Sequence, residues 1–253
     1  MLVQTLGIDL ATEPVRTAVC TVDWDGTDAV AGILAEPATD RALIAACRTA
    51  DKVGIDCPFG WPDPFVTALV AHQDAQPWPG RGLAGSAFRR QLASRATDLH
   101  VQSTTGVWPL SVSANLLGLT AMRCAGLLDA LAPVDRVGTG QIAEVYPAAA
   151  LRIWGLWKPG YKQLGGREVL GLMLDGLRAD LPTLRFAPGA EQRCRESHDA
   201  FDALVSALVA RAAACGLTTP PQDGQQQRRA QTEGWIHLPT VGPRDLSRAP
   251  AAP

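Results

Sequence analysis

The sequence predicts an α/β fold built on a mixed five-stranded sheet, in which three antiparallel strands are followed by parallel strands. Three observations lead to this prediction. Short apolar or alternating runs typical of strands fill much of residues 2–57, a further apolar run follows at 141–146, and helical patterns lie between and after them. The composition agrees, because 47% of the 253 residues are hydrophobic and 19% are charged, as in globular proteins.

The first part of the chain predicts a three-stranded meander, a helix and a fourth strand parallel to the first. Thr39 is the expected N-cap of an amphipathic helix, and Asp25 with Gly26 supplies the turn between the second and third strands. The fourth strand is fully apolar, which suits the interior of a parallel pair. These strands are predicted at residues 2–10, 15–24, 29–35 and 52–57.

The segment after the fourth strand interrupts this pattern. Prolines and glycines break up its first part, and an apolar helical segment covers residues 114–131. We therefore expect one domain over residues 1–240, with a large helical and loop insertion at about 62–139 between strands four and five. The insertion is expected to cover one end of the sheet.

The chain after the fifth strand is predicted to be mainly helical. A polar loop is expected at 222–231, a short strand-like segment at 234–239 and a disordered tail at 241–253. Helices are predicted at residues 148–155, 168–181 and 199–215.

Charge and apolar patterning exclude several classes of protein. The formal net charge of -2 excludes a strongly basic coat for nucleic acid. Apolar stretches end well before the roughly 18 residues that a membrane span needs, so no membrane partner is expected. The first residues lack the pattern of a signal peptide, and a cytoplasmic location is the expectation. Six widely spaced cysteines offer no zinc or redox motif.

Two apolar strands end in the same tripeptide, Gly-Ile-Asp, at residues 7–9 and 54–56. An ionised carboxylate inside a strand is costly unless it is paired or bound to a metal. If the two strands are neighbours, Asp9 and Asp56 meet at their carboxyl ends, where open α/β sheets bind ligands. The alternative is that each aspartate only caps the following turn.

Three further acids extend this set. Glu144 is the acid in the third apolar run, where a surface position is the alternative to a functional one. Asp199 and Asp202 are three residues apart, so they share one helical face with small residues that allow close packing on the sheet. Asp199 also fits a helix-dipole role after an N-cap at Ser197, but Asp202, among apolar residues, fits that explanation less well.

A cluster of carboxylates without histidine or thiolate suits Mg²⁺ or Mn²⁺ rather than Zn²⁺. Two such ions about 4 Å apart would polarise a phosphodiester and lower the pKa of an attacking water. Without metal, clustered acids would raise one another's pKa. The sequence thus predicts a metal-dependent hydrolase site at Asp9, Asp56, Glu144, Asp199 and Asp202.

Motifs along the whole chain resemble a known family. They are GIDLA (7–11), GIDCPFGWP (54–62), RRQLASRATDLHV (89–101), EVYPAAAL (144–151), GYK (160–162) and SHDAFDALVSALVAR (197–211). In this order they resemble the DUF429 family of predicted nucleases with a ribonuclease H-like fold, over most of residues 1–240. They are also distantly similar to Holliday-junction resolvases of the RuvC type.

The resemblance implies catalytic and metal-binding roles for Asp9, Asp56, Asp199 and Asp202, with Glu144 as a further member of the acidic site. It also implies phosphodiester hydrolysis of nucleic acid, with DNA and RNA left open. The resolvases carry Glu at the position of Asp56, and the shorter Asp side chain reduces the reach of this ligand.

Four basic side chains are candidates for binding the phosphate backbone: Arg89, Arg90, Arg95 and Lys162. A solvated helix face explains the three arginines equally well, and an exposed loop explains the lysine.

Two other functions remain open. The first is a nucleotide-binding phosphotransferase of the sugar-kinase and actin type, which shares this core topology but needs a glycine-rich phosphate turn after the first strand. Here Leu10, Ala11 and Thr12 occupy that turn. The second is a non-catalytic member that keeps the fold as a binding module. The presence of all the acids argues against this alternative.

Overall fold

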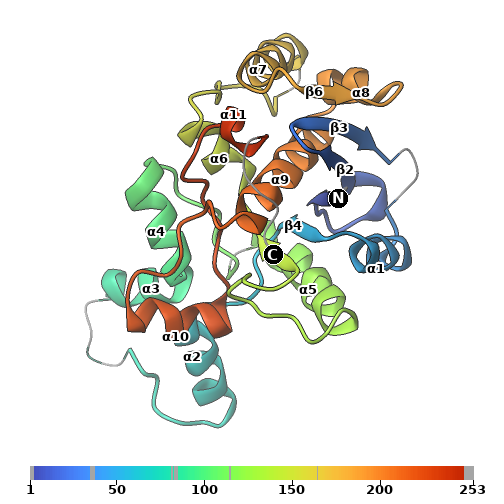
Figure 1. Cartoon of the computed structure of the whole chain (residues 1–253). Helices are drawn as coiled ribbons and strands as arrows, with labels where there is room; N and C mark the ends of the chain where they lie inside the picture. The colour runs from blue at the N-terminus through green and yellow to red at the C-terminus, as the bar shows by residue number, and fades with distance from the viewer. Residues whose placement is uncertain are drawn as a thin grey trace.

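The computed structural model describes residues 3–34, 38–80, 82, 85–113, 115–163 and 165–247. A mixed sheet forms the centre of the molecule, with helices on both of its faces (Figure 1). Within the described ranges the sheet has six strands in the order β5-β4-β1-β2-β3-β6. These strands are β1 (Val3–Asp9), β2 (Ala18–Asp25), β3 (Asp28–Ile33), β4 (Lys52–Asp56), β5 (Ile142–Glu144) and β6 (Leu184–Phe186).

The strand directions confirm the predicted mixed α/β sheet. β1, β2 and β3 are antiparallel neighbours, β4 is parallel to β1, and β5 is parallel to β4. The predicted number of five strands is wrong, because β6 adds a sixth, parallel to β3. β6 has only three residues, too few for an apolar alternation to identify it.

Eleven α-helices lie in the part of the chain that the structure describes. They are α1 (Asp40–Thr49), α2 (Asp63–Gln73), α3 (Gly85–Ala93), α4 (Ala96–Thr105), α5 (Asn115–Ala130), α6 (Pro147–Ile153), α7 (Arg167–Asp180), α8 (Ala190–Glu196), α9 (His198–Ala214), α10 (Gly224–Glu233) and α11 (Pro243–Leu246). A 3₁₀ turn, η1, spans Pro14–Arg16. The predicted N-caps of α1 and α9 are present: the Thr39 and Ser197 side chains accept the backbone N–H of Ala42 and Ala200.

Two predictions about the C-terminal part need correction. The segment 222–231 was expected as a polar loop but forms most of α10, whose N-cap Asp223 accepts two backbone N–H groups. Within the expected tail, Pro243–Leu246 form α11, and Leu246 is fully buried beside α9. The last residues, 248–253, lie outside the described ranges.

The two faces of the sheet have separate apolar cores. One core lies under α1 and α5 and includes Leu6, Ile8 and Ile55 from the strands. The other is formed mainly by α6, α7 and α9, and includes Val22 and Trp24. Figure 1 shows α9 crossing β1, β2 and β4 on this second face. No described helix is both long and apolar enough to cross a membrane.

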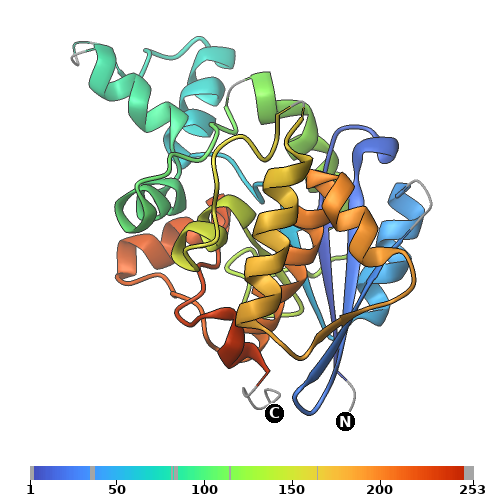
Figure 2. The ribbon, with the colours of Figure 1, turned by 90° about the horizontal axis from the view of Figure 1, so that it is seen from above.

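The insertion between β4 and β5 contributes α2 to α5. Its helix α5 packs on the sheet beside α1, whereas α2 and α3 project to one side of the molecule (Figure 2). Helix α4 joins this lobe to α6 and α10. The insertion thus contributes a wall beside the carboxyl ends of β1 and β4.

Candidate functional site

The two Gly-Ile-Asp tripeptides lie side by side in register. β1 and β4 are parallel neighbours that pair Gly7 with Gly54 and Asp9 with Asp56. Because residues two apart in a strand face the same way, each aspartate lies on the same face as its glycine. The sequence prediction that these two acids meet at the strand ends is therefore confirmed.

Helix α9 supplies the third acid because it packs closely on the two glycines. A Cβ at Gly7 would collide with the backbone of Ala203 and Ala207, and one at Gly54 would lie 2.6 Å from the backbone oxygen of Ser206. This close approach is possible only without side chains on the strands. It brings the fully buried Asp202 beside the two strand acids.

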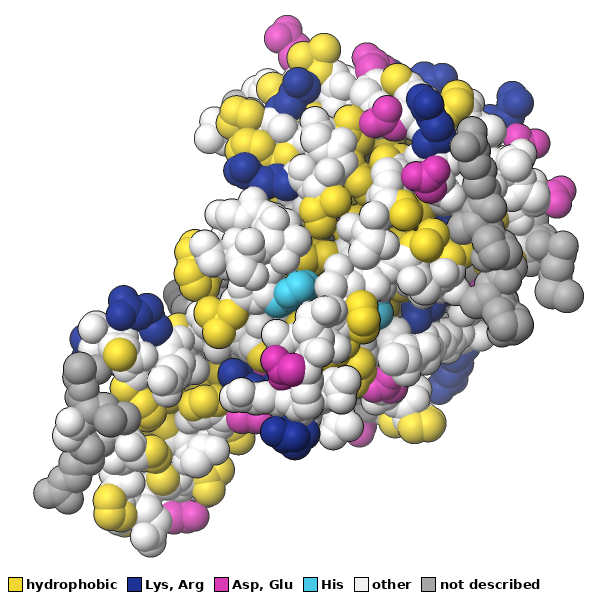
Figure 3. Space-filling model, turned by 60° about the vertical axis from the view of Figure 1, so that its left-hand side comes forward, with side chains coloured by type: hydrophobic (Ala, Val, Ile, Leu, Met, Phe, Trp, Pro, Cys, Tyr) yellow, Lys and Arg dark blue, Asp and Glu magenta, His cyan; other side chains and the backbone are white. Residues whose placement is uncertain are grey.

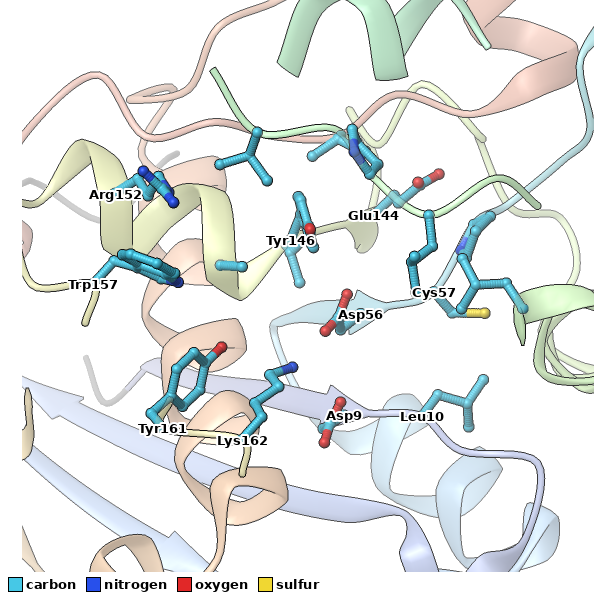
Figure 4. Close-up of a pocket in the computed structure, with 18 of the residues that line it drawn as sticks. Asp9, Leu10, Asp56, Cys57, Glu144, Tyr146, Arg152, Trp157, Tyr161 and Lys162 are labelled. Carbon is cyan, nitrogen blue, oxygen red and sulfur yellow. The ribbon is translucent and has the colours of Figure 1, made fainter. Parts of the chain in front are cut away.

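The carboxylates of Asp9, Asp56 and Asp202 form one cluster, in which an oxygen from each lies within 4.8 Å of the others. Figure 4 shows the carboxylates of Asp9 and Asp56 pointing into the same space. Three oxygen donors from three separate elements suit a hard divalent cation such as Mg²⁺ or Mn²⁺. The residues present therefore fit the predicted metal.

Burial raises the pKa of all three acids, and repulsion from neighbouring acids adds to the shift at Asp9 and Asp56. Burial, followed by the charges of Asp202 and Asp56, holds the pKa of Asp9 well above its usual range. Burial, with a contribution from Asp202, raises the pKa of Asp56 to about 7 although Lys162 opposes the shift. Burial also raises the pKa of Asp202. Positive charge is therefore needed to keep the cluster ionised at neutral pH.

Lys162 and Tyr161 supply part of that compensation. The Lys162 ammonium lies 2.6 Å from Asp202 Oδ2, and the Tyr161 hydroxyl donates to Asp202 Oδ1 at 3.3 Å. Burial disfavours the charged lysine, but Asp202 and its neighbours hold the pKa of Lys162 well above its usual value. The predicted phosphate-binding lysine thus lies inside the acidic cluster. Tyr161, in the quoted GYK motif, had no predicted role.

Glu144 lies apart from the three-acid cluster. Both of its oxygens accept hydrogen bonds from Arg95, at 2.8 and 2.9 Å, and Oε2 also accepts the backbone N–H of Phe59. Figure 4 shows its carboxylate pointing away from Asp9 and Asp56. Glu144 is therefore fully used in an ion pair, and the structure gives it no open oxygen for a metal.

Arg95 has a structural role in place of the predicted phosphate contact. Its side chain is 2% exposed and bonds to Asp98, to Glu144 and to the backbone oxygen of Glu233. These bonds tie α4 to β5 and to the end of α10. The guanidinium could therefore donate a hydrogen bond to a substrate only by breaking a bond of this network.

Asp199 lies at the edge of the site and outside the three-acid cluster. Its carboxylate is 3.7 Å from Arg16 and 2.8 Å from the Nδ1 of His198. It lines a shallow hollow that also reaches Asp9 and Lys162. Asp199 is therefore close enough to act on the charge at Asp9, but the structure does not bring it together with Asp56 and Asp202.

The predicted basic residues of α3 lie away from the acids. Arg89 and Arg90 are both exposed. Arg90 lines a separate cavity of about 800 Å³, together with Trp108 and Arg229. Among the four predicted phosphate-binding residues, Lys162 is thus the one that the structure pairs with the cluster of Asp9, Asp56 and Asp202.

A cavity of about 530 Å³ opens beside the acidic cluster. Asp9, Asp56 and Lys162 line one part of it (Figure 4). The sequence reasoning missed most of the remaining wall, which comes from loops and from α6. This wall includes Val107, Pro109, Leu110, Leu117, Tyr146, Arg152, Trp157, Tyr161 and Ile236. The aromatic residues after β5 were the one feature of the sequence that marked this wall, but their spacing does not predict a cavity.

The fold and site define a class: an α/β protein that gathers one buried and two half-buried carboxylates where two parallel strands end beneath a crossing helix. The chain belongs to the DUF429 family, whose model, described as "Protein of unknown function (DUF429)", matches residues 7–226. Neither the curated proteins nor the solved structures contain a match to the chain.

Proposed function

We propose that this protein is a divalent-metal-dependent hydrolase of phosphodiester bonds in nucleic acid, with a ribonuclease H-like arrangement. The observation that carries the proposal is the convergence of Asp9, Asp56 and Asp202 from β1, β4 and α9. Three clustered acids with raised pKa values destabilise the protein at neutral pH unless a cation binds them. Perturbed acids lining a cavity are typical of functional sites.

The topology supports the ribonuclease H-like part of the proposal. Three antiparallel strands are followed by parallel β4 and β5, and a late helix carries the Asp-x-x-Asp pair across the sheet. The resemblance implied acids on the first strand, on the fourth strand and on this helix. All three positions contribute to the cluster, with Asp202 as the member from the helix.

The local charges favour one bound ion rather than the two expected from the sequence. The three ionised carboxylates and the Lys162 ammonium together carry a net negative charge that one divalent cation neutralises. A second ion would need Glu144 or Asp199, but Arg95 occupies the first, and Arg16 and His198 flank the second. When bound, the ion would polarise the phosphodiester and lower the pKa of the attacking water.

Lys162 has the role of a mobile counter-charge in this proposal. Its side chain is 47% exposed, so it has room to leave Asp202 when a metal takes that oxygen. The displaced ammonium would then face the phosphate in the cavity as a point charge. Tyr161 stays on Asp202 and keeps this carboxylate oriented.

The phosphotransferase alternative has less support at the turn after β1. The backbone N–H of Ala11 donates to Thr17 Oγ1, and its carbonyl accepts from Arg123. These groups are therefore engaged by the protein itself, whereas a phosphate turn presents free N–H groups. The alternative of a non-catalytic module is decided by the following experiment.

Cleavage assays with labelled single-stranded and duplex DNA and RNA test the proposal. We expect wild type to cleave at least one of them with Mn²⁺ or Mg²⁺ and not with EDTA. The Asp9→Asn variant should lose at least about 100-fold in rate, since it removes a ligand of the ion. Asp175→Asn, which changes an exposed acid paired with Arg195, is the matched control and should keep full activity. Absence of cleavage with every substrate and metal would favour the binding module.

A further inference from the structure

A stacked arginine–tryptophan pair forms one part of the cavity wall. Arg152 lies near the end of α6, and the chain then turns back so that the backbone N–H of Trp157 bonds to the carbonyl of Leu151. This turn places the Arg152 guanidinium 3.8 Å from the centroid of the Trp157 ring. Both side chains line the cavity that contains Asp9 and Asp56 (Figure 4).

The charge of Arg152 is not paired with an acid in the described ranges of the chain. Of the other cations that line this cavity, Arg95 is paired with Glu144 and Asp98, and Lys162 with Asp202. Arg152 is exposed, and its side chain has neither an ion pair nor a hydrogen bond to any part of the chain that the structure describes. A guanidinium held over an indole ring, with its N–H donors not engaged by the described residues, is ready to bind a phosphate or a planar base.

The remainder of the wall suits a flat, uncharged ring. Tyr146 lies between the stacked pair and the acids in Figure 4, and Tyr161 faces the same space. Val107, Leu110 and Ile236 add apolar surface. The volume of about 530 Å³ is within the range of small-molecule pockets. Such a pocket admits one nucleotide unit with its base unstacked, but not a base-paired helix.

Neither the net charge nor the face drawn in Figure 3 favours binding of a duplex by its backbone. The chain has a formal net charge of -2, and Lys and Arg are scattered among acidic and apolar side chains on the face drawn in Figure 3. Binding a duplex through its phosphates needs many cations together. Stacking of an unpaired base on aromatic rings supplies affinity without that charge.

We propose that Arg152 and Trp157 form a subsite for one unpaired nucleotide, and that the substrate is single-stranded nucleic acid. The base lies against the Trp157 and Tyr146 side of the cavity, a neighbouring phosphate meets Arg152, and the phosphate to be cleaved lies at the three acids. This inference rests on the proposed function for the position of the cleaved bond. The binding of an unpaired base does not depend on cleavage.

Fluorescence anisotropy with a labelled oligothymidylate, as a single strand and annealed to oligoadenylate, tests the subsite in EDTA, where metal-dependent cleavage cannot occur. We expect wild type to bind the single strand at least about tenfold more tightly than the duplex. Arg152→Gln and Trp157→Phe should each weaken single-strand binding by at least about fivefold. Arg185→Gln, which changes an exposed arginine of β6 outside the cavity, is the matched control and should bind as wild type does.

Two outcomes would overturn the inference: equal binding of single strand and duplex, or unchanged single-strand binding in both Arg152→Gln and Trp157→Phe. Mn²⁺ titration by calorimetry separates this failure from failure of the proposed function. Arg152→Gln should keep the Mn²⁺ affinity of wild type, and Asp9→Asn should lose it. Selective single-strand binding without any cleavage would support the subsite and refute the hydrolase.

Discussion

At the scale of single residues, Asp56 shows most clearly how the charges of the site affect the stability of the protein. Burial raises its pKa to about 7 in the folded protein, against an ordinary value of 3.8. Between these two pH values the folded state binds a proton that the unfolded state has released. The free energy of unfolding of the metal-free protein must therefore fall as the pH rises from about 4 to 7.

We expect this loss of stability to be on the order of a few kcal/mol, because one pKa unit corresponds to about 1.4 kcal/mol. Urea denaturation in EDTA at pH 5 and pH 8 measures it. Asp56→Asn should reduce the difference between the two pH values, whereas Asp28→Asn, in an exposed strand end, should leave it unchanged. A stability that rises over this interval in wild type would contradict the assignment.

Lys162 stands where a metal would otherwise bind Asp202. Replacing it in Lys162→Gln removes the ion pair at 2.6 Å, so the metal-free protein should lose about 1 kcal/mol, a modest value because solvent screens a half-exposed lysine. Mn²⁺ should bind about tenfold more tightly, since no ammonium competes for the carboxylate. Calorimetry measures the affinity, with Lys158→Gln, an exposed lysine outside the cavity, as control. Weaker Mn²⁺ binding in Lys162→Gln would show that the lysine supports the ion instead of competing with it.

At the scale of elements, the close contact of α9 with β1 and β4 determines the geometry of the site. Gly7 faces the helix backbone with no room for a side chain. We expect Gly7→Ala to lower the free energy of unfolding by about 3 kcal/mol or more, because two backbone segments must separate. Chemical denaturation measures the change.

Gly118→Ala is the matched control for this prediction. Gly118 lies in α5, and a Cβ there would meet open space. Alanine should therefore raise stability by up to about 1 kcal/mol through its helix propensity. A loss at Gly118 as large as that at Gly7 would mean that the close packing of α9 is not what requires glycine.

The elements differ in how far the sequence predicted them. Strand β4 and helix α9 carry clear apolar patterns, so their ends were predicted to within one or two residues. Helix α10 is polar, with only Ala230 and Glu233 buried, so no apolar period marked it. Its formation depends on the Asp223 cap and on the docking of Glu233 against α2 and α4, which only the folded chain provides.

At the scale of the whole molecule, a buried polar network joins the insertion to the sheet. Arg95 binds Glu144 of β5 and Asp98 of α4, while the Glu233 carboxylate accepts the backbone N–H groups of Asp63 and Ala96. Removing one partner from such a network leaves the others buried and unpaired.

We therefore expect Arg95→Gln to destabilise the protein by about 3–5 kcal/mol, with the loss shared by the insertion and the sheet. Thermal and urea unfolding followed by circular dichroism measure the loss. Arg89→Gln, on the exposed face of α3, should change stability by less than about 0.5 kcal/mol. A small effect of Arg95→Gln would mean that apolar contacts alone hold the insertion in place.

The sequence by itself determined the mixed sheet, the helix that crosses it and the pairing of Asp9 with Asp56, because apolar period and a repeated tripeptide are local properties of the chain. Tertiary structure alone decided which other charged groups join these two. In the folded chain Asp202 and Lys162 lie beside Asp9 and Asp56, Glu144 pairs with Arg95, and Asp199 lies outside the cluster. The physical reason is that the cost of a buried charge depends on its partners, and partners such as Lys162 and Asp202 or Arg95 and Glu144 are forty or more residues apart in the chain.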